Sequence, residues 1–227
     1  KEYRRQRQMC IRDSPYAAKR PPIDTHYFET FNKDHVTLVD LQADPLAEIV
    51  QNGITLESGT HHELDVIVFA TGYDAMTGPL LNLNIETATA SLKSYWEGGP
   101  RNYLGLAIPG FPNLFTITGP GSPSVLSNMP VSIEQHVDWI TECIAHCLET
   151  GCTSIEAQEQ SAEIWTDHVR ETADATLLPK VKHSWYLGAN IPGKPRVFMP
   201  YAGGLNIYRK ICDNIAEEGY KLSLIHI

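Results

Sequence analysis

The segment Leu64–Gly78, LDVIVFATGYDAMTG, constrains the fold of this chain more than any other. A run of β-branched and aromatic residues, Val66–Phe69, stands between an aspartate and the small residues Ala70–Gly72. Such a run is typical of a parallel strand buried on both faces, and open α/β sheets bind ligands at the carboxyl ends of their strands. We therefore expect an α/β fold with a ligand close to Thr71 and Gly72, although Ala-Thr-Gly is also a common turn sequence.

A β-meander is predicted around this strand. His35–Leu41 alternates as a strand. Ala47–Gln51 and Ile54–Glu57 flank Asn52-Gly53, a dipeptide that favours a type I′ hairpin because both positions tolerate positive φ. Leu114–Thr118 is predicted as a second buried strand.

Three helices are predicted in the second half, over Pro130–Thr150, Ser161–Leu177 and Leu205–Glu218. Gly151 ends the first, and Ser132 with Gln135 could form a capping box near its start. Apolar residues at helical spacing are expected on one face of the first helix: Ile133, Val137, Ile140, Ile144 and Cys147. Those expected to point inward from the last helix are Leu205, Tyr208, Cys212 and Ile215.

Charge and composition exclude several classes of partner. The formal net charge of −9 argues against nucleic acid and anionic membranes as partners, and no apolar run approaches the ~20 residues that span a bilayer. No secretory signal is recognised, and a cytoplasmic location is expected. Cys143, Cys147 and Cys152 are interpreted as buried free thiols, and His61–His62 as solvated, so no metal site is predicted.

Four segments of the chain resemble one enzyme family. They are the ATG segment described above, Lys19–Asp40, Asn102–Ile140 and Ser184–Leu205. In the same order and at the same spacing, they resemble the C-terminal portion of Baeyer–Villiger monooxygenases, which are flavoproteins with two dinucleotide-binding domains. The resemblance implies that residues 15–70 close an NADP-binding domain and that residues 71–221 form the C-terminal half of an FAD-binding domain. No G-x-G-x-x-G phosphate-binding motif occurs in the chain.

Both ends of the chain are interpreted as non-native. Residues 222–227 read LSLIHI, and residues 9–14 read MCIRDS. One DNA sequence that encodes the first hexapeptide can encode the second on its opposite strand. Residues 1–14 and 222–227 are therefore expected to derive from a sequencing adapter, and they are left out of the fold predictions.

The resemblance also assigns roles to individual residues. Arg20 matches the catalytic arginine, whose planar, permanently charged guanidinium would stabilise anions formed during oxygen transfer. Trp185 matches a tryptophan on a mobile loop that closes over the nicotinamide cofactor. Residues matched to the substrate pocket are Ser124, Val125 and Leu126, and those matched to cofactor binding are Lys19, Thr71, Gly72, Asp74, Gly119, Asn128 and Met129.

Each of these residues also has a plain structural interpretation. Lys19 and Arg20 could be a solvated basic pair ahead of a proline turn, and Trp185 could be a packing anchor. The stretch Gly119–Met129 could be a loop that caps a helix. A serine hydrolase is excluded at Ser122 or Ser124, because the G-x-S-x-G elbow is absent.

The implied reaction is insertion of one oxygen atom of O2 next to a ketone carbonyl, using FAD and NADPH. One alternative is a related flavin monooxygenase that oxidises nitrogen or sulfur. A second alternative is that this polypeptide alone is a truncated, non-catalytic product that binds no flavin, because the glycine motifs are missing.

Overall fold

The computed structural model of this protein describes residues 23–220 and 224–226. The chain divides into two compact units, Lys1–Gly72 and Tyr73–Ile227, and each is described by itself. Within the described ranges, no helix combines the length and apolar character needed to cross a membrane.

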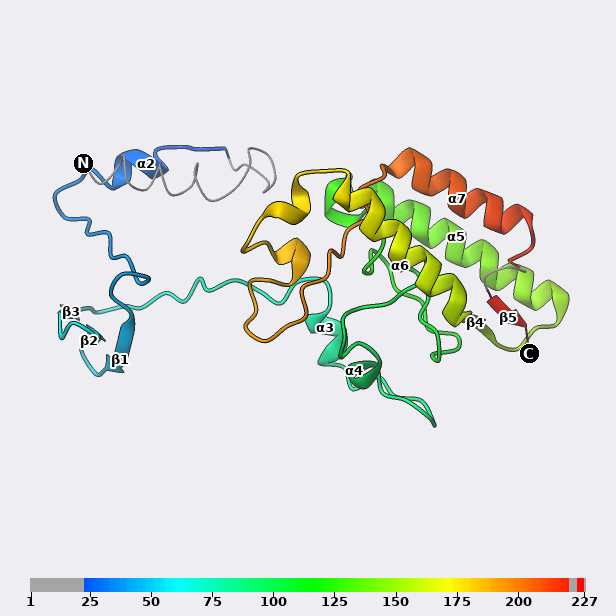
Figure 1. Ribbon diagram of the computed structural model, residues 1–227, viewed down its shortest axis with the longest axis horizontal. Coiled ribbons are helices and arrows are strands. Elements are labelled where there is room, and N and C mark those ends of the chain that lie inside the picture. The colour runs from blue at the N-terminus through cyan, green and yellow to red at the C-terminus, as the bar shows by residue number, and fades with distance from the viewer. Residues whose placement is uncertain (1–22, 221–223, 227) are drawn as a thin grey trace. The chain divides into compact units, whose positions relative to one another are not determined.

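The first unit is built around a three-stranded antiparallel sheet in the order β1-β2-β3 (Figure 1). After helix α2 (Tyr27–Thr30) come β1 (Leu46–Val50), β2 (Gly53–Leu56) and β3 (His61–Glu63). β1 pairs with β2, so the hairpin predicted over Ala47–Gln51 and Ile54–Glu57 is confirmed, and β2 pairs in turn with β3, a strand that was not predicted. Its strands are largely exposed, and in β2 only the terminal residues Gly53 and Leu56 are buried.

Two details of the predicted meander are wrong. His35–Leu41 forms no strand. In the hairpin, Val50 pairs with Gly53, so the turn residues are Gln51 and Asn52, and neither has the positive φ that a type I′ turn requires. Gly53 is needed for another reason, because a Cβ there would collide with the backbone carbonyl of His62 on β3.

The predicted buried parallel strand at Leu64–Phe69 is also wrong for this structure. The segment is irregular, and the side chains of Val66, Val68 and Phe69 are 74%, 82% and 69% exposed. A strand buried on both faces needs hydrogen-bonded neighbours, but the described part of the sheet pairs β1, β2 and β3 only among themselves. Leu114–Thr118 likewise forms a single bridge, between Phe115 and Ala107.

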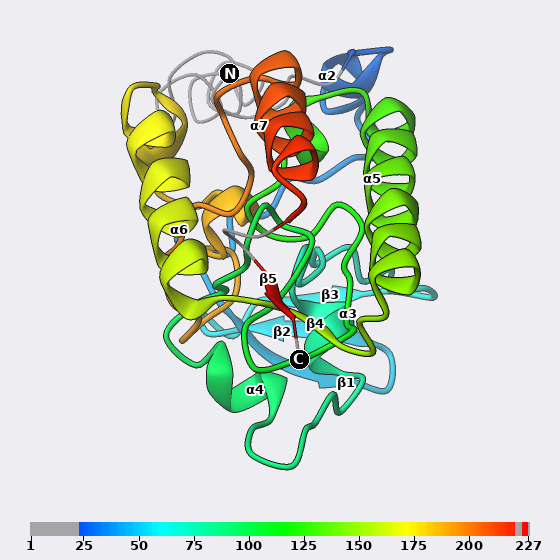
Figure 2. The ribbon, with the colours of Figure 1, turned by 90° about the vertical axis from the view of Figure 1, so that its right-hand side faces the viewer.

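The second unit is organised by three long helices, which lie side by side in Figures 1 and 2. They are α5 (Met129–Thr150), α6 (Glu159–Asp174) and α7 (Leu205–Glu217), as predicted to within a few residues. Near one end of the helices, a short antiparallel pair is formed by β4 (Ile155–Ala157) and β5 (Leu224–His226). The remaining elements are short: α3 (Gly78–Leu81), α4 (Leu92–Tyr95), η1 (Ser124–Leu126), η2 (Leu178–Lys180) and η3 (Trp185–Leu187).

The main core of this unit lies between the helices and the turn at residues 103–107. Trp139 of α5, Trp165 of α6 and Tyr208 of α7 are all buried in it. Trp139 donates its indole N–H to the carbonyl oxygen of Cys212 on α7 at 2.9 Å. The predicted inward face of α7 is confirmed, since Tyr208 and Cys212 are fully buried and both Leu205 and Ile215 pack against the core.

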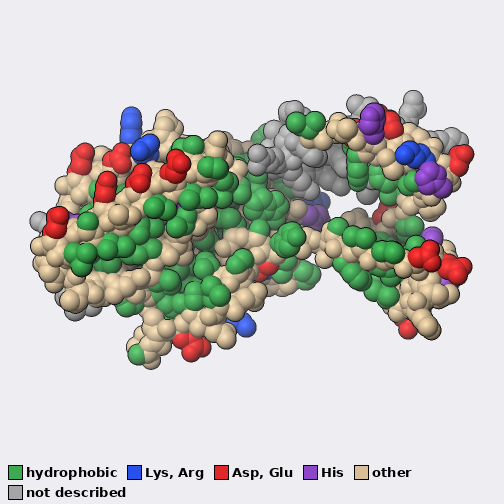
Figure 3. Space-filling model, turned by 180° about the vertical axis from the view of Figure 1, so that it is seen from behind, with side chains coloured by type: hydrophobic (Ala, Val, Ile, Leu, Met, Phe, Trp, Pro, Cys, Tyr) green, Lys and Arg blue, Asp and Glu red, His purple; other side chains and the backbone are tan. Residues whose placement is uncertain are grey.

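The predicted face of α5 is confirmed only in part, since Cys147 is buried and Ile140 packs against the core. Ile133, Val137 and Ile144 are 38%, 42% and 45% exposed. Apart from Cys147, the buried side chains of the helix lie one residue away in register; they are Ser132, Gln135, His136, Trp139 and Cys143. Apolar residues occur on both sides of α5, so periodicity alone could not select the side that packs against α7. Figure 3 shows hydrophobic side chains gathered over a broad area of one surface of this unit.

The predicted capping box is also absent. The N-cap of α5 is Asn128, and Ser132 lies inside the helix with its hydroxyl 2.5 Å from that of Ser127. None of the three predicted thiols forms a disulfide with another described residue: Cys143 and Cys147 are buried, as predicted, and Cys152 is only partly buried. Burial raises the pKa of the Cys143 thiol to about 12, which keeps it protonated and unreactive.

Candidate functional site

The turn Gly119–Ser122 is held in place by three hydrogen bonds between its backbone and other segments. The N–H of Gly121 donates to the carbonyl of Met199 at 2.6 Å, and the N–H of Tyr201 donates to the carbonyl of Ser122 at 2.7 Å. The indole N–H of Trp165 on α6 donates to the carbonyl of Gly121 at 3.0 Å. This turn is therefore a fixed support for the residues that follow it.

A buried histidine holds the residue just before that turn. The N–H of Thr118 donates to Nδ1 of His136 at 3.0 Å, so this imidazole is neutral with its proton on Nε2. His136 is fully buried against the ring of Tyr208, and burial lowers its pKa to about 4. Thr118 has a positive φ of 55°, an unusual conformation for threonine. His136 was missed by the sequence analysis, because a histidine inside a helix gives no sign of what it bonds.

Trp185 lies on a loop that is connected to the same turn. It begins the short helix η3, where the Ser184 hydroxyl accepts a hydrogen bond from the N–H of Tyr186. The carbonyl of Tyr186 accepts from the N–H of Met199 at 2.8 Å. Since the carbonyl of Met199 binds Gly121, one short segment joins the Trp185 loop to the glycine turn.

The residues predicted for the substrate pocket form the 3-10 helix η1. Ser124 is buried with a positive φ of 35°, and its hydroxyl lies 3.9 Å from the sulfur of Met76. Val125 packs against a cluster that contains Tyr186 and Phe198. Leu126 is 36% exposed. The structure therefore brings η1 together with the Trp185 loop, through Val125.

The N-terminus of α5 follows η1 directly. Asn128 is exposed and its side chain makes no capping hydrogen bond, while Met129 is the first helical residue. The first N–H groups of a helix have no partner inside the helix and carry partial positive charge. This end of α5 can therefore receive an electron-rich group.

Asp74 is joined to the loop that follows Trp185. Its carboxylate forms an ion pair with Lys194, whose ammonium group also lies 2.5 Å from the Thr77 hydroxyl. Nearby, the amide of Asn190 donates to the carbonyl of Tyr73 at 3.0 Å. Asp74, Thr77 and Lys194 form part of the wall of a cavity of about 600 Å³. Lys194 was missed by the sequence analysis, although its place beside glycine and proline in IPGKP marks a loop residue.

The other predicted residues lie elsewhere. Thr71 and Gly72 are exposed at the end of the first unit. Gly72 has a φ of +91°, which favours glycine, and no atom lies within 4 Å of the position that a Cβ would take. The backbone conformation therefore explains the glycine, and close approach of another group does not. Lys19 and Arg20 lie outside the described residues.

The known proteins with similar sequences described here are all named monooxygenases. A Baeyer–Villiger monooxygenase of Pseudooceanicola batsensis is 44% identical over 204 residues, which make up 89% of this chain and 37% of that protein. The chain belongs to the Baeyer–Villiger monooxygenase family. Cyclohexanone 1,2-monooxygenase of an Acinetobacter species is 42% identical, with 91% of this chain and 38% of that protein matched. Phenazine N-monooxygenase PhzNO1 of Lysobacter antibioticus is 38% identical, with 97% of this chain and 40% of that protein matched.

Solved structures agree with this assignment. An oxidised steroid monooxygenase bound to NADP matches with a TM-score of 0.80 and 47% identity, over 92% of this chain and 39% of that one. OTEMO in complex with FAD and NADP matches with a TM-score of 0.84 and 34% identity, over 92% of this chain and 38% of that one. No protein-family model matches the chain. The chain therefore spans about two fifths of the length of the relatives it matches.

Proposed function

We propose that this chain is the C-terminal part of an FAD- and NADPH-dependent monooxygenase that inserts one oxygen atom of O2 next to a ketone carbonyl, giving an ester or lactone. The observation that carries the proposal is family membership at 44% identity across 89% of the chain. We further propose that residues 15–70 close the NADP-binding domain and that residues 71–221 form half of the FAD-binding domain.

The N-terminus of α5, in the second unit, is proposed to bind one edge of the flavin ring. Asn128 leaves the first N–H groups of α5 without a side-chain cap, and this positive end suits the pyrimidine edge of the ring, where negative charge accumulates on reduction. Asn128, Met129 and Gly119 would hold that edge, and Asp74 with Thr71 and Gly72 would complete the cofactor contacts. When bound and reduced by NADPH, FAD supplies the oxygen-activating chemistry that side chains lack.

Trp185 is proposed to cover the nicotinamide. Its side chain is 36% exposed and packs edge-on against Tyr186 with ring centroids 4.5 Å apart, so it is only partly used as a packing anchor. Because its loop and the glycine turn share Met199, movement of the loop would reach the flavin side of the site. A closed loop would exclude water during oxygen transfer.

Arg20 is proposed as the catalytic residue, with Lys19 beside it on NADP. In the intact enzyme, Arg20→Ala should leave reduction of the flavin by NADPH in place and lower ester formation on the order of 10²–10³-fold. Arg20→Lys should lower ester formation as well, because a compact ammonium group cannot replace the planar guanidinium with its several fixed N–H donors. Stopped-flow reduction and product analysis would measure both steps, with Arg209→Ala on the exposed surface of α7 as control. Near-normal ketone turnover in either Arg20 variant would refute the assignment.

Oxidation of nitrogen is the second candidate, because the similar protein from Lysobacter antibioticus is a phenazine N-monooxygenase. Offering the intact enzyme a cyclic ketone and an aromatic amine in competition, with NADPH and O2, would separate the two functions. For the isolated chain, we propose that the missing glycine motifs prevent flavin binding. A purified chain that retains stoichiometric FAD would contradict this.

A further inference from the structure

The loop that carries Trp185 is fixed at its base by backbone hydrogen bonds. The N–H of Val197 donates to the carbonyl of Leu187 at 3.1 Å, and the N–H of Met199 donates to the carbonyl of Tyr186 at 2.8 Å. These two bonds pair the outgoing arm of the loop with the returning arm. Leu187 and Tyr186 are also buried, so the base belongs to the packed structure of the second unit.

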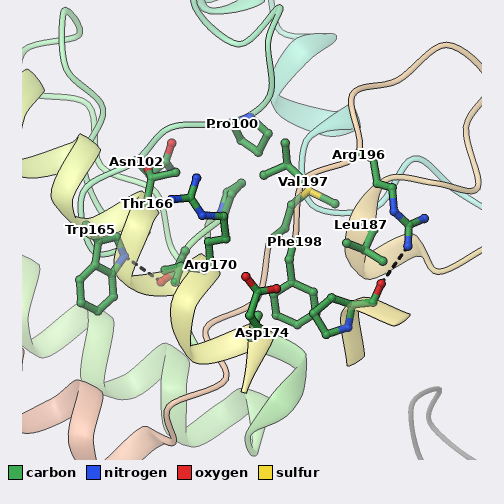
Figure 4. Close-up of a pocket in the computed structure, with 16 residues that line it drawn as sticks. Pro100, Asn102, Trp165, Thr166, Arg170, Asp174, Leu187, Arg196, Val197 and Phe198 are labelled. Atoms are coloured by element: carbon green, nitrogen blue, oxygen red, sulfur yellow. Dashed lines mark hydrogen bonds between the residues drawn. The ribbon is translucent and has the colours of Figure 1, made fainter. Parts of the chain in front are cut away.

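Arg196 holds the returning arm from another side. Its guanidinium donates to the backbone carbonyls of Pro179, Val181 and Lys182 at 2.9, 2.7 and 2.8 Å, and Figure 4 draws one of these bonds. Neither these bonds nor those between the two arms involve residues 73–77. The position of the base therefore does not depend on that segment.

The tip of the loop, residues 188–195, is held differently. Lys194 forms an ion pair with Asp74, and its ammonium group also lies 2.5 Å from the Thr77 hydroxyl. The side chains of Lys194 and Asp74 are 13% and 35% exposed, and Thr77 is buried. Water screens a partly buried pair less than an exposed one, and removal of one member leaves the other charge without its partner.

The Lys194 side chain also contacts the residue that ends η3. A Cβ at Gly188 would lie 3.1 Å from Cδ of Lys194, so the aliphatic stem of the lysine runs close against this glycine. Gly188 is the C-cap of η3, the short helix that begins with Trp185. A second, uncharged contact of the tip is the hydrogen bond from the Asn190 amide to the carbonyl of Tyr73.

We propose that Lys194 is a positioning residue, which fastens the tip of the loop to Asp74 and Thr77 and thereby fixes the end of η3 beside Trp185. Residues of the tip also line the cavity of about 600 Å³, so the same contact keeps one wall of that cavity in place. The consequence for NADPH rests on the proposed function, in which Trp185 covers the nicotinamide. The contact itself does not rest on it.

Hydrogen exchange of the full chain, followed by mass spectrometry, tests the contact without any cofactor. Lys194→Met keeps the stem and removes the ammonium group, so peptides from the tip should exchange roughly tenfold faster. Exchange at Val197 and Met199 of the base should be unchanged. Lys93→Met is the matched control, because this exposed lysine lines the same cavity, and it should exchange as the parent does. Unchanged exchange at the tip, or an equal increase at tip and base, would overturn the proposal.

Thr77→Val gives a second test if Lys194→Met fails to fold. It removes one of the two groups that contact the ammonium, at similar size, and it leaves the ion pair with Asp74 in place. Exchange at the tip should rise by a smaller factor, roughly threefold. A folded Thr77→Val variant whose tip exchanges as the parent does would contradict the proposed role of Lys194.

The consequence for the cofactor is tested in the intact enzyme. Lys194→Met should raise the dissociation constant for NADP⁺ roughly tenfold, while flavin reduction at saturating NADPH stays within about twofold of the parent rate. General damage to the fold would change both quantities. An unchanged dissociation constant, despite faster exchange at the tip, would refute the role of Lys194 toward NADPH. If the parent enzyme itself oxidises no NADPH, the proposed function fails, whereas the exchange experiment still decides whether Lys194 holds the tip.

Discussion

Two short apolar segments of this chain differ in how far their side chains are buried. Val66–Phe69, in the first unit, is mostly exposed, with Val68 82% exposed. Leu104–Phe111, in the second unit, forms no long strand either, yet Leu104, Leu106 and Ile108 are fully buried. Two backbone carbonyls of this second segment accept hydrogen bonds from residues outside it. The Tyr208 hydroxyl donates to the carbonyl of Leu104, and the N–H of Thr116 donates to the carbonyl of Leu106.

The difference shows what an apolar run does and does not predict. It predicts that the segment must be covered, because apolar surface in contact with water costs free energy. It does not say where the cover comes from. For Leu104–Phe111, α4 and the three long helices provide it. For Val66–Phe69, the described residues of the first unit provide little, since only Ile67 is partly buried.

The largest effect that tests this comparison is expected at Phe111. This side chain is 2% exposed and packs with Leu92, Trp96 and Ile108. Phe111→Ala should lower the free energy of unfolding of the second unit by about 3–5 kcal/mol, through lost burial and the cavity left behind. Urea denaturation followed by tryptophan fluorescence would measure it. A loss below 1 kcal/mol would mean that this segment is not enclosed in solution.

A smaller effect is expected from pH, through His136. Its pKa is about 4 in the folded protein against about 6.5 when exposed. The unfolded chain therefore takes up a proton at a higher pH than the folded chain does. The stabilisation is complete above pH 6.5 and is lost as the pH falls toward 4, on the order of 3 kcal/mol in total.

Urea denaturation between pH 7 and pH 4.5 would follow this loss. His136→Gln is the control, since it removes the titrating group and should flatten that part of the pH dependence, although the variant is less stable throughout. An equally steep decline in the variant would assign the effect to other groups.

The smallest effect is expected at Phe69, the matched residue of the exposed segment. With its side chain 69% exposed, Phe69→Ala should change the free energy of unfolding of the chain by no more than about 0.5 kcal/mol. A loss comparable with that of Phe111→Ala would show that Val66–Phe69 is covered in solution and would remove the contrast between the two segments.

Local signals in the sequence predicted part of this structure well. The three helices and the β1–β2 hairpin follow from apolar spacing and from Gly151 and Asn52-Gly53, which act within a few residues. The buried face of α5 and the parallel strands were not predictable, because both depend on which partner packs against them.

The candidate site shows the same limit. The positions of Trp185 and Asn128 follow from the resemblance of their surroundings. The bond between His136 and Thr118 and the ion pair between Lys194 and Asp74 join residues 18 and 120 positions apart. No local pattern encodes such a pairing, so only the folded chain reveals it.

The exposed segment has a further consequence for the chain in solution. Val66–Thr71, VIVFAT, is rich in β-branched and aromatic residues and contains no charge, proline or glycine. Such six-residue stretches, when exposed, associate into cross-β stacks between copies. The concentration at which this chain begins to self-associate is therefore expected to depend on this segment more than on its net charge of −9. A single charged side chain at Val68, facing solvent, would act as a gatekeeper against that association.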